Sequence, residues 1–176
     1  MRTLVLGGIR SGKSDWAETV IAGNTTVRYI ATGPSAGSDE SWAARVAAHR
    51  DRRPPSWVTV ETTALAAELR DRPDIATLVD DLGGWLTEAL DRAGWDGPSP
   101  AGEIDELLGA VGDFTAPLLL VSPEVGMSVV PATTAGRRFA DELGALNRRL
   151  AAVCERVVLV VAGQPLWIKP AAKEPF

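Results

Sequence analysis

The feature that most constrains this chain is an eight-residue stretch near its start, Gly7-Gly8-Ile9-Arg10-Ser11-Gly12-Lys13-Ser14. It fits the pattern G-x-x-x-x-G-K-S/T, a glycine-rich loop whose backbone N–H groups cradle phosphates. The glycines permit backbone conformations that a Cβ would forbid and let the N–H groups approach phosphate oxygens. In such loops the lysine contacts the β- and γ-phosphates and the hydroxyl residue binds Mg²⁺. We therefore expect this stretch to bind a nucleotide, with Lys13 at the phosphates and Ser14 as a metal ligand.

The residues on either side of the loop supply the structural context that it needs. Thr3 to Leu6 form an apolar run that predicts a buried strand, and Asp15 to Ala22 carry apolar residues on one side, which predicts a helix. Strand, loop and helix come in the order found in nucleotide-binding α/β proteins. The alternative, a glycine-rich turn without a ligand, is disfavoured by this order.

Further along the chain, apolar runs alternate with helical patterns. Strands are predicted over 27–32, 57–61, 75–79, 118–121, 157–161 and 166–168, and helices over 39–50, 64–69, 85–92, 103–111 and 136–154. Thr62 or Thr63 is expected to cap helix 64–69, and 94–102 to form the longest loop. This alternation predicts an α/β fold, a single P-loop NTPase-like domain over 1–169 with a mostly parallel sheet and helices on both faces. Residues 170–176 are expected to form a flexible tail.

Composition excludes several classes of protein. The single cysteine, Cys154, excludes an internal disulfide framework and is predicted to be a buried thiol. The net charge of −5 disfavours a nucleic-acid partner, so the expected phosphates belong to a small nucleotide. No apolar run approaches the length of a membrane span, and the N-terminus has no signal-peptide pattern. We therefore expect a cytoplasmic protein.

Two acidic residues stand at the ends of predicted buried strands, where ligands gather in open α/β sheets. Asp80 follows the strand 75–79, and Glu124 follows the strand 118–121. Either carboxylate is a candidate partner for Mg²⁺, directly or through water. The alternatives are a helix cap for Asp80 and, for Glu124, a structural carboxylate bound to backbone amides.

A basic segment carries the only histidine of the chain, His49. The arginines Arg45, Arg50, Arg52 and Arg53 surround it, and such a cluster suits triphosphate or pyrophosphate. The alternative is a solvated helix end with an incidental histidine, and spacing alone does not separate the two interpretations.

Two further arginines, Arg137 and Arg138, open the helix predicted over 136–154. That end of a helix is unfavourable for cations, so they face either a phosphate, another subunit or solvent. Of these, exposure to solvent is the favoured interpretation.

Taken together, these motifs resemble the bifunctional adenosylcobinamide kinase / adenosylcobinamide-phosphate guanylyltransferase family of cobalamin biosynthesis. The loop matches the family's GGxRSGKS, 29–32 match its second strand, and residues from Arg45 to Glu61 match RxxxHxxxRPxxWxxxE. Further matches are the block from Glu124 to Pro131, EVGMGxVP in the family, and the final-helix residues Arg138, Phe139, Asp141, Gly144 and Asn147. Departures are Asp81-Leu82-Gly83-Gly84 in place of a Cys or small polar residue and Leu-Thr, Pro123 for Asn, Ser128 for Gly and Arg148 for Gln.

The resemblance implies two reactions and a set of site residues. Adenosylcobinamide would be phosphorylated by a nucleoside triphosphate, ATP or GTP, and GMP would then be transferred from GTP through a covalently guanylylated His49. Lys13 would be the second catalytic residue, Mg²⁺ would be the metal, and the protein would be a homotrimer. Nucleotide contacts would come from 7–14, Thr32, Gly33, Pro34, Arg50, Asp51, Arg52, Arg53, Glu61 and Asp80, and metal ligands from Ser14, Asp80 and Glu124.

Two rival interpretations share the loop. A single-activity kinase of the nucleoside-kinase type would not need His49. A nucleotide-sensing module would bind a nucleotide without turning it over.

Overall fold

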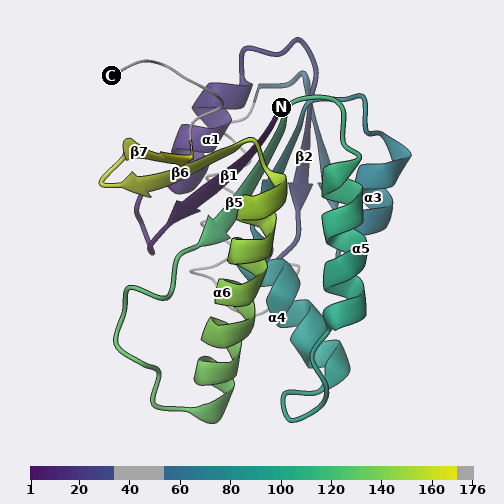
Figure 1. Ribbon diagram of the computed structural model, residues 1–176. Helices are drawn as coiled ribbons and strands as arrows, with labels where there is room; N and C mark the ends of the chain where they lie inside the picture. Colours follow the sequence, from purple (N-terminus) through teal and green to yellow (C-terminus); the bar gives the residue numbers. More distant parts are fainter. Residues whose placement is uncertain (34–53, 170–176) are drawn as a thin grey trace.

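A computed structural model describes residues 1–33 and 54–169. They contain a seven-stranded sheet with the strand order β3-β2-β4-β5-β1-β6-β7 (Figure 1). Neighbouring strands run parallel, except for β7, which is antiparallel to β6. The predicted α/β fold with a mostly parallel sheet is therefore confirmed. The strands are β1 (Arg2–Gly7), β2 (Val27–Ala31), β3 (Trp57–Glu61), β4 (Thr77–Asp80), β5 (Leu118–Pro123), β6 (Arg156–Val161) and β7 (Gln164–Lys169). The helix predicted over 39–50 and the tail 170–176 lie outside the described residues.

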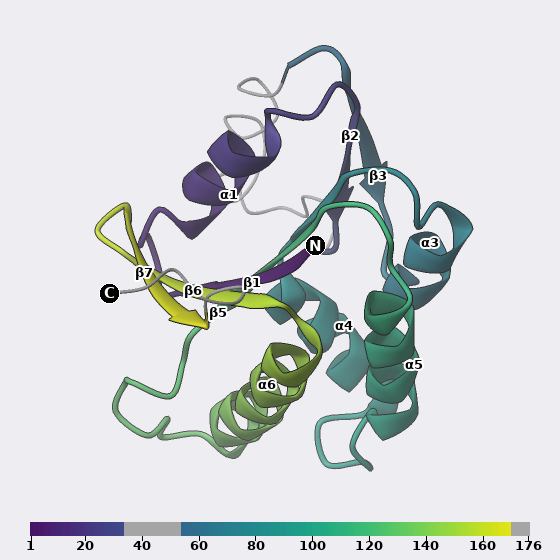
Figure 2. The same ribbon diagram turned by 45° about the horizontal axis from the view of Figure 1, so that its top comes forward.

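Helices cover both faces of the sheet, as predicted. In the described part of the chain, α1 (Lys13–Ile21) covers one face (Figure 2). The other face is covered by α3 (Leu65–Asp71), α4 (Leu82–Ala93), α5 (Ala101–Gly112) and α6 (Thr134–Val153). None of these helices is both long and apolar enough to cross a membrane.

The central strands are buried on both faces, which explains why they read as continuous apolar runs. Along β1, Leu4 and Leu6 pack into the core shared with α3 to α6, whereas Val5 packs into the core under α1. The second core includes Ala17 and Ile21 of α1. Because β1 contributes to both cores, the loop that follows it starts from a fully packed strand.

Several helix ends differ from the prediction, because other residues nearby in the sequence cap or begin these helices. The helix α4 begins at Leu82, not Trp85, since the Asp81 side chain caps it by accepting a hydrogen bond from Gly84 N at 2.8 Å. The expected threonine cap of α3 is wrong, because Ala64 is the N-cap residue and the Thr62 hydroxyl accepts from Ala64 N at 3.0 Å. The helix α5 begins at Ala101, so the loop predicted over 94–102 is shorter than the segment 124–133 between β5 and α6.

Of the two arginines at the start of α6, Arg137 is exposed, as the favoured interpretation expects, whereas Arg138 is half-buried against backbone carbonyls. Arg138 donates to the carbonyls of Gly94, Trp95 and Pro98, with Nη2 at 2.8 Å from Pro98 O. Arg137 Nη1 donates to Ala132 O at 2.8 Å. Arg138 therefore anchors the loop between α4 and α5 to α6.

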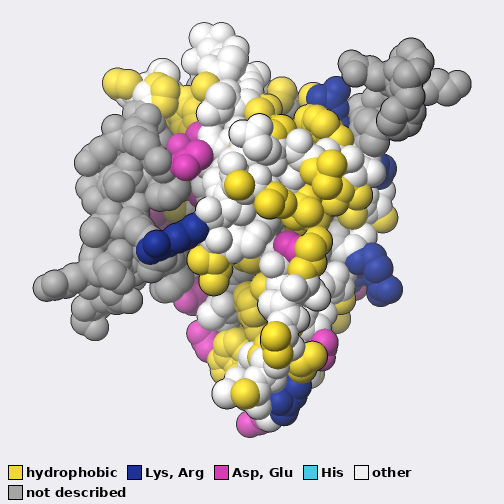
Figure 3. All heavy atoms as spheres, turned by 90° about the vertical axis from the view of Figure 1, so that its left-hand side faces the viewer, with side chains coloured by type: hydrophobic (Ala, Val, Ile, Leu, Met, Phe, Trp, Pro, Cys, Tyr) yellow, Lys and Arg dark blue, Asp and Glu magenta, His cyan; other side chains and the backbone are white. Residues whose placement is uncertain are grey.

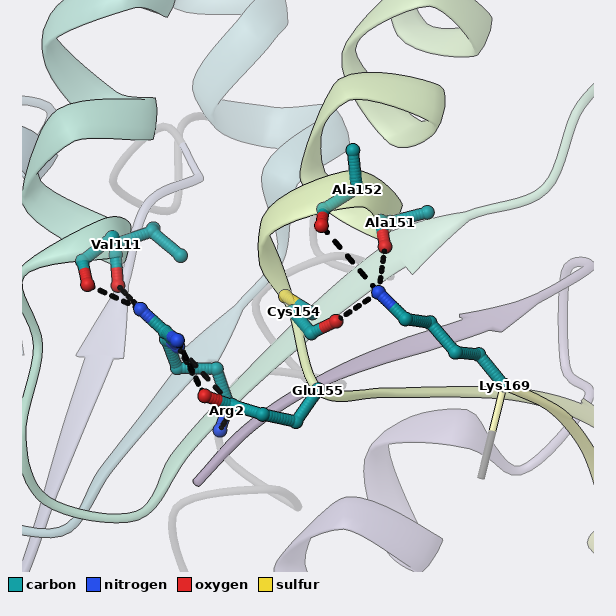
Figure 4. Close-up of polar contacts among 8 residues, drawn as sticks. Arg2, Val111, Ala151, Ala152, Cys154, Glu155 and Lys169 are labelled. Carbon is teal, nitrogen blue, oxygen red and sulfur yellow. Dashed lines mark hydrogen bonds and ion pairs between the residues drawn. The ribbon is translucent and has the colours of Figure 1, made fainter. Parts of the chain in front are cut away.

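A polar network closes the end of the sheet where β1 begins (Figure 4). Arg2 forms an ion pair with Glu155 and also donates to the carbonyls of Val111 and Gly112 at the end of α5. Lys169 Nζ donates to Ala151 O at 2.9 Å and to Cys154 O at 2.6 Å, so a cation occupies the C-terminal end of α6. Burial raises the pKa of the Cys154 thiol to about 12, which confirms the predicted buried thiol.

Candidate nucleotide-binding site

The carboxyl ends of the parallel strands bring the candidate residues to one edge of the sheet. In the strand register, Gly7 pairs with Pro123, and Ala31 pairs with both Asp80 and Glu61. Thr32 and Glu124 directly follow two of these positions. The described candidate residues therefore share the edge where the glycine-rich loop emerges.

The loop between β1 and α1 has the backbone that phosphate binding requires. Gly12 is the N-cap residue of α1 and has a φ of 87°, a left-handed conformation that favours glycine. A Cβ on Gly7 would lie 2.9 Å from the backbone oxygen of Val160 and would also meet Ser11 Oγ, so glycine is favoured under the loop. The N-cap residue Gly12 brings no side-chain cap of its own to α1, and the N–H groups at the start of a helix are favourable partners for an anion.

The turn between β6 and β7 contacts this loop directly. Gly163 N donates to Ser11 O at 2.8 Å, and Ala162 and Gly163 have positive φ values of 50° and 76°, as in a two-residue hairpin turn. A Cβ on Gly12 would lie 3.1 Å from Gly163 Cα. The hairpin therefore packs directly against the phosphate loop.

The first turn of α1 places the hydroxyl of Ser14 beside Asp80. Ser14 Oγ donates to Asp80 Oδ1 at 3.2 Å, and the Tyr29 hydroxyl donates to Asp80 Oδ2 at 2.7 Å. The Lys13 ammonium lies over the loop, 3.4 Å from Gly8 O. A serine hydroxyl and a carboxylate are oxygen donors of the kind that Mg²⁺ takes beside nucleotide phosphates, and their role as metal ligands here stays a prediction.

The neighbouring acidic residue, Asp81, has a structural role. Its side chain caps α4, and its backbone carbonyl accepts a hydrogen bond from the Thr32 hydroxyl. Burial, together with the adjacent Asp80 charge, raises the pKa of Asp81, although Gly84 N–H and the Lys13 charge oppose the shift. The alternative interpretation of Asp80 as the helix cap is therefore wrong, because Asp81 fills that position.

Glu124 is held by backbone groups at the start of the segment 124–133. Its Oε1 accepts from Gly126 N at 2.7 Å, and its own N–H donates to Gly7 O at 3.0 Å. Asn147 of α6 accepts from Ser122 Oγ at 2.6 Å and donates to Pro123 O at 3.0 Å, which fixes the end of β5. The contact with Gly126 is the one expected of a structural carboxylate, and a role for Glu124 as a metal ligand remains a prediction.

The structure does not bring every candidate residue to the loop. Glu61 ends the edge strand β3, four strand positions from β1, or roughly 19 Å at a spacing of about 4.8 Å. His49, Pro34 and Arg50 to Arg53 lie outside the described residues. Within the described ranges, no group of three or more His, Cys, Asp or Glu side chains could hold a metal. Mg²⁺ needs no such group, since it keeps several waters and takes one or two protein oxygens beside the phosphates.

Sequence reasoning missed the roles of Tyr29 and Gly163. Tyr29 is the one tyrosine of the chain and interrupts an apolar strand with a hydroxyl, which is a signal of a buried polar contact. Gly163 follows the most apolar strand and precedes a short one, a pattern typical of a hairpin turn. Nothing in the sequence pattern tells which partner either residue meets.

Two of the departures from the family pattern contact each other. A Cβ on Gly83 would lie 2.8 Å from Pro123 Cγ, and a Cβ on Gly84 would lie 3.0 Å from Gly33 Cα. The glycines in the first turn of α4 thus make room for the Pro123 ring and for the chain after β2. The changes at positions 83 and 123 are therefore sterically matched.

Comparisons with known proteins give matches over nearly the whole chain. The family model for cobinamide kinase / cobinamide phosphate guanyltransferase matches residues 3–168. The bifunctional adenosylcobalamin biosynthesis protein CobP of Pseudomonas aeruginosa is 43% identical over 174 residues, covering 96% of this chain and 98% of that protein. The CobU protein of the same description from Salmonella typhimurium is 38% identical over 185 residues, covering 96% and 100%.

A solved structure from Pyrococcus horikoshii OT3 supports the fold alone, with a TM-score of 0.55 at 6% identity over 97% of this chain and 87% of that one. The family model and the two curated relatives span nearly the whole chain, in agreement with the resemblance carried by its motifs. The chain therefore belongs to the cobinamide kinase / cobinamide phosphate guanyltransferase family of enzymes.

Proposed function

We propose that this enzyme phosphorylates adenosylcobinamide with ATP or GTP and then transfers GMP from GTP to the product, giving adenosylcobinamide-GDP. The observation that carries the first half is the contact of Ser14 Oγ with Asp80 Oδ1, 3.2 Å apart, at the N-terminus of α1. It supports a nucleotide site with Mg²⁺ at the carboxyl edge of the sheet. The match to the family over residues 3–168 supports the second half.

In the kinase step, the acceptor hydroxyl oxygen forms a bond to the γ-phosphorus. The bond from that phosphorus to the β–γ bridging oxygen breaks, the nucleoside diphosphate leaves, and the hydroxyl proton passes to solvent. The loop N–H groups hold the β- and γ-phosphates, and Lys13 stabilises the negative charge on the transferring group. Mg²⁺, when held by Ser14 and Asp80, neutralises charge on the same phosphates. Glu124 is an alternative ligand for it.

In the guanylyl step, a neutral His49 imidazole nitrogen forms a bond to the α-phosphorus of GTP and pyrophosphate leaves. A phosphate oxygen of adenosylcobinamide phosphate then attacks the same phosphorus and releases the histidine. Arg50, Arg52 and Arg53 would steady the departing pyrophosphate and disfavour protonation of the imidazole. Splitting the transfer avoids bringing two polyanions together in one step.

The preference for guanine over adenine would come from residues at the ends of β2 and β3, which lie away from the glycine-rich loop. Glu61 would accept hydrogen bonds from guanine N1 and N2, which adenine does not offer in the same arrangement. Thr32 and Gly33, with Pro34, would line the nucleotide beside it. The separation of Glu61 from β1 by three intervening strands favours a guanine site apart from the phosphate loop.

We also propose the homotrimer expected from the family resemblance, with the β6–β7 hairpin in the subunit contact. Hydrophobic side chains gather on the face that Figure 3 turns toward the viewer, the side where the hairpin lies in Figure 1. Leu166, Trp167 and Ile168 of the edge strand β7 are 61%, 44% and 56% exposed. Apolar side chains on an unpaired edge favour association with another chain.

Leu166→Asp should lower the sedimentation coefficient, whereas Val58→Asp on the opposite edge, where Val58 is 56% exposed, should not.

Transfer of labelled γ-phosphate from ATP or GTP to adenosylcobinamide tests the kinase step. Product formation excludes the sensing module, and no product with either nucleotide refutes the kinase assignment. Labelled GMP bound to the protein, stable to base and labile to acid, separates the bifunctional enzyme from a single-activity kinase.

A further inference from the structure

Tyr29 lies in β2 with its side chain on the sheet face that α1 covers, and it is only 3% exposed. Its hydroxyl donates to Asp80 Oδ2 at 2.7 Å, the short distance typical of a hydroxyl bound to a carboxylate. We propose that Tyr29 is a positioning residue that orients the Asp80 carboxylate for Mg²⁺-dependent nucleotide binding. This inference rests on the proposed nucleotide site, and it adds a residue that contacts neither metal nor nucleotide.

The strand register explains why a tyrosine stands at this position. Tyr29 pairs with Leu78 of β4, so Asp80 is its diagonal neighbour on the same face. Diagonal neighbours in a sheet are about 7–8 Å apart, a distance that an aromatic side chain spans. A phenylalanine would reach as far, but it would bring no donor to the carboxylate.

Packing fixes the position of the Tyr29 hydroxyl. The Tyr29 ring stacks on Trp57 of β3, with centroids 6.4 Å apart and an interplanar angle of 27°. It also belongs to the core under α1, which includes Ala17 and Ile21. The donor is therefore held by the sheet and does not depend on a mobile side chain.

Asp80 is consequently held from two sides. Oδ1 accepts from Ser14 in α1, and Oδ2 accepts from Tyr29 in β2. Rotation of the carboxylate about its Cβ–Cγ bond would disrupt both contacts. The bond to Tyr29 thus keeps the other carboxylate oxygen directed at Ser14, where the metal would lie.

Tyr29→Phe tests this role because it keeps the ring and removes only the donor. Loss of a residue that orients a metal ligand typically lowers metal affinity by about 10- to 100-fold. We expect a roughly 10-fold higher Mg²⁺ concentration for half-maximal binding of a non-hydrolysable ATP analogue, followed by calorimetric titration. Binding of the same analogue in EDTA and the melting temperature should stay at the parental values.

Thr77→Val is the matched control, since it removes another buried hydroxyl from the neighbouring strand. Thr77 Oγ1 donates to Ile75 O at 2.8 Å, at the end of β4 away from the site. This variant should keep the parental Mg²⁺ dependence. In an Asp80→Ala background, Tyr29→Phe should change the Mg²⁺ dependence much less than it does in the parent, because the carboxylate that it orients is absent.

Two results would overturn the proposal for Tyr29: an unchanged Mg²⁺ dependence in Tyr29→Phe, or an equal loss of affinity in EDTA, which would indicate a deformed loop. A parent protein that binds the analogue equally well with and without Mg²⁺ would instead refute the metal site itself, and with it the proposal.

Discussion

Gly83→Ala tests whether the departures at positions 83 and 123 are matched. The new Cβ would lie 2.8 Å from Pro123 Cγ, 3.1 Å from Pro123 Cδ and 3.2 Å from Asp81 Oδ1. The proline ring is rigid and ends a buried strand, so it has little freedom to move away. The substitution should therefore destabilise the fold beside the nucleotide site.

The magnitude follows from two opposing effects. Overpacking a close contact costs about 1–3 kcal/mol, whereas replacing a helical glycine by alanine gains about 0.5–1 kcal/mol. The net expectation is a loss of up to about 2.5 kcal/mol in the free energy of unfolding, with a middle value of about 1 kcal/mol. Gly144 in α6 is exposed and a Cβ there would meet nothing within 4 Å, so Gly144→Ala should gain about 0.5–1 kcal/mol. The two glycine substitutions should thus differ in sign.

Urea unfolding of the parent, both single glycine variants, Pro123→Ala and Gly83→Ala/Pro123→Ala measures this directly. Removing the ring should relieve the contact, so the double variant should be more stable than additivity predicts, by about 1–2 kcal/mol. A Gly83→Ala variant that gains as much stability as Gly144→Ala would refute the steric argument. Additivity within about 0.5 kcal/mol would show that the two positions are not coupled.

Three other outcomes are expected. Lys13→Ala should abolish phosphoryl transfer to adenosylcobinamide, and turnover within a few-fold of the parent would place the ammonium elsewhere. Glu61→Gln should reduce the preference for GTP over ATP in equilibrium binding by at least about 10-fold, since a hydrogen bond to a charged group contributes about 1.5–3 kcal/mol. Hydrogen bonding and ion pairing with Arg2 lower the pKa of Glu155 to about 2, so its stabilisation is complete above the ordinary pKa of 4.5 and is lost as the pH falls through 2. Glu155→Gln should therefore lose about 1 kcal/mol of unfolding free energy at pH 7, a difference that shrinks toward pH 2 in urea titrations.

The elements that the sequence predicts well are those determined by local pattern. The loop from Gly7 to Ser14 carries its own glycines, and the runs that became β1, β5 and β6 are apolar on both faces because both faces are buried. The same patterns place Asp80 at a strand end. The fold class and the approximate site follow from these signals alone.

What the sequence does not predict depends on contacts between distant segments. Asp80 and Asp81 look equivalent in sequence. In the structure, Asp80 accepts a hydrogen bond from Ser14 of α1, whereas Asp81 caps α4. In the sequence, Gly83 and Gly84 look like residues that precede a helix. The atoms that leave no room for a side chain at these positions belong to Pro123 and Gly33, which lie far away in the sequence. Strand order brings these groups together, and periodicity carries no information about strand order.

The partners of Arg138 also could not be predicted from the sequence, and a helix-dipole argument places this side chain in solvent. In the structure it donates to the carbonyls of Gly94, Trp95 and Pro98, all in the loop between α4 and α5. The unsatisfied carbonyls of a loop are not visible in a sequence, so a cation at an unfavourable helix end reads as exposed. Its partners explain its position.

The central claim, two reactions with a histidine nucleophile for the second, is tested most directly by labelling with GTP that carries its label at the α-phosphate. After denaturation and proteolysis, the account predicts GMP on the peptide that contains His49, stable to base and labile to acid. His49→Ala and His49→Asn should lose the label while keeping the parental melting temperature and most of the kinase activity. Covalent GMP on either variant, or on any other peptide of the parent, would contradict the account.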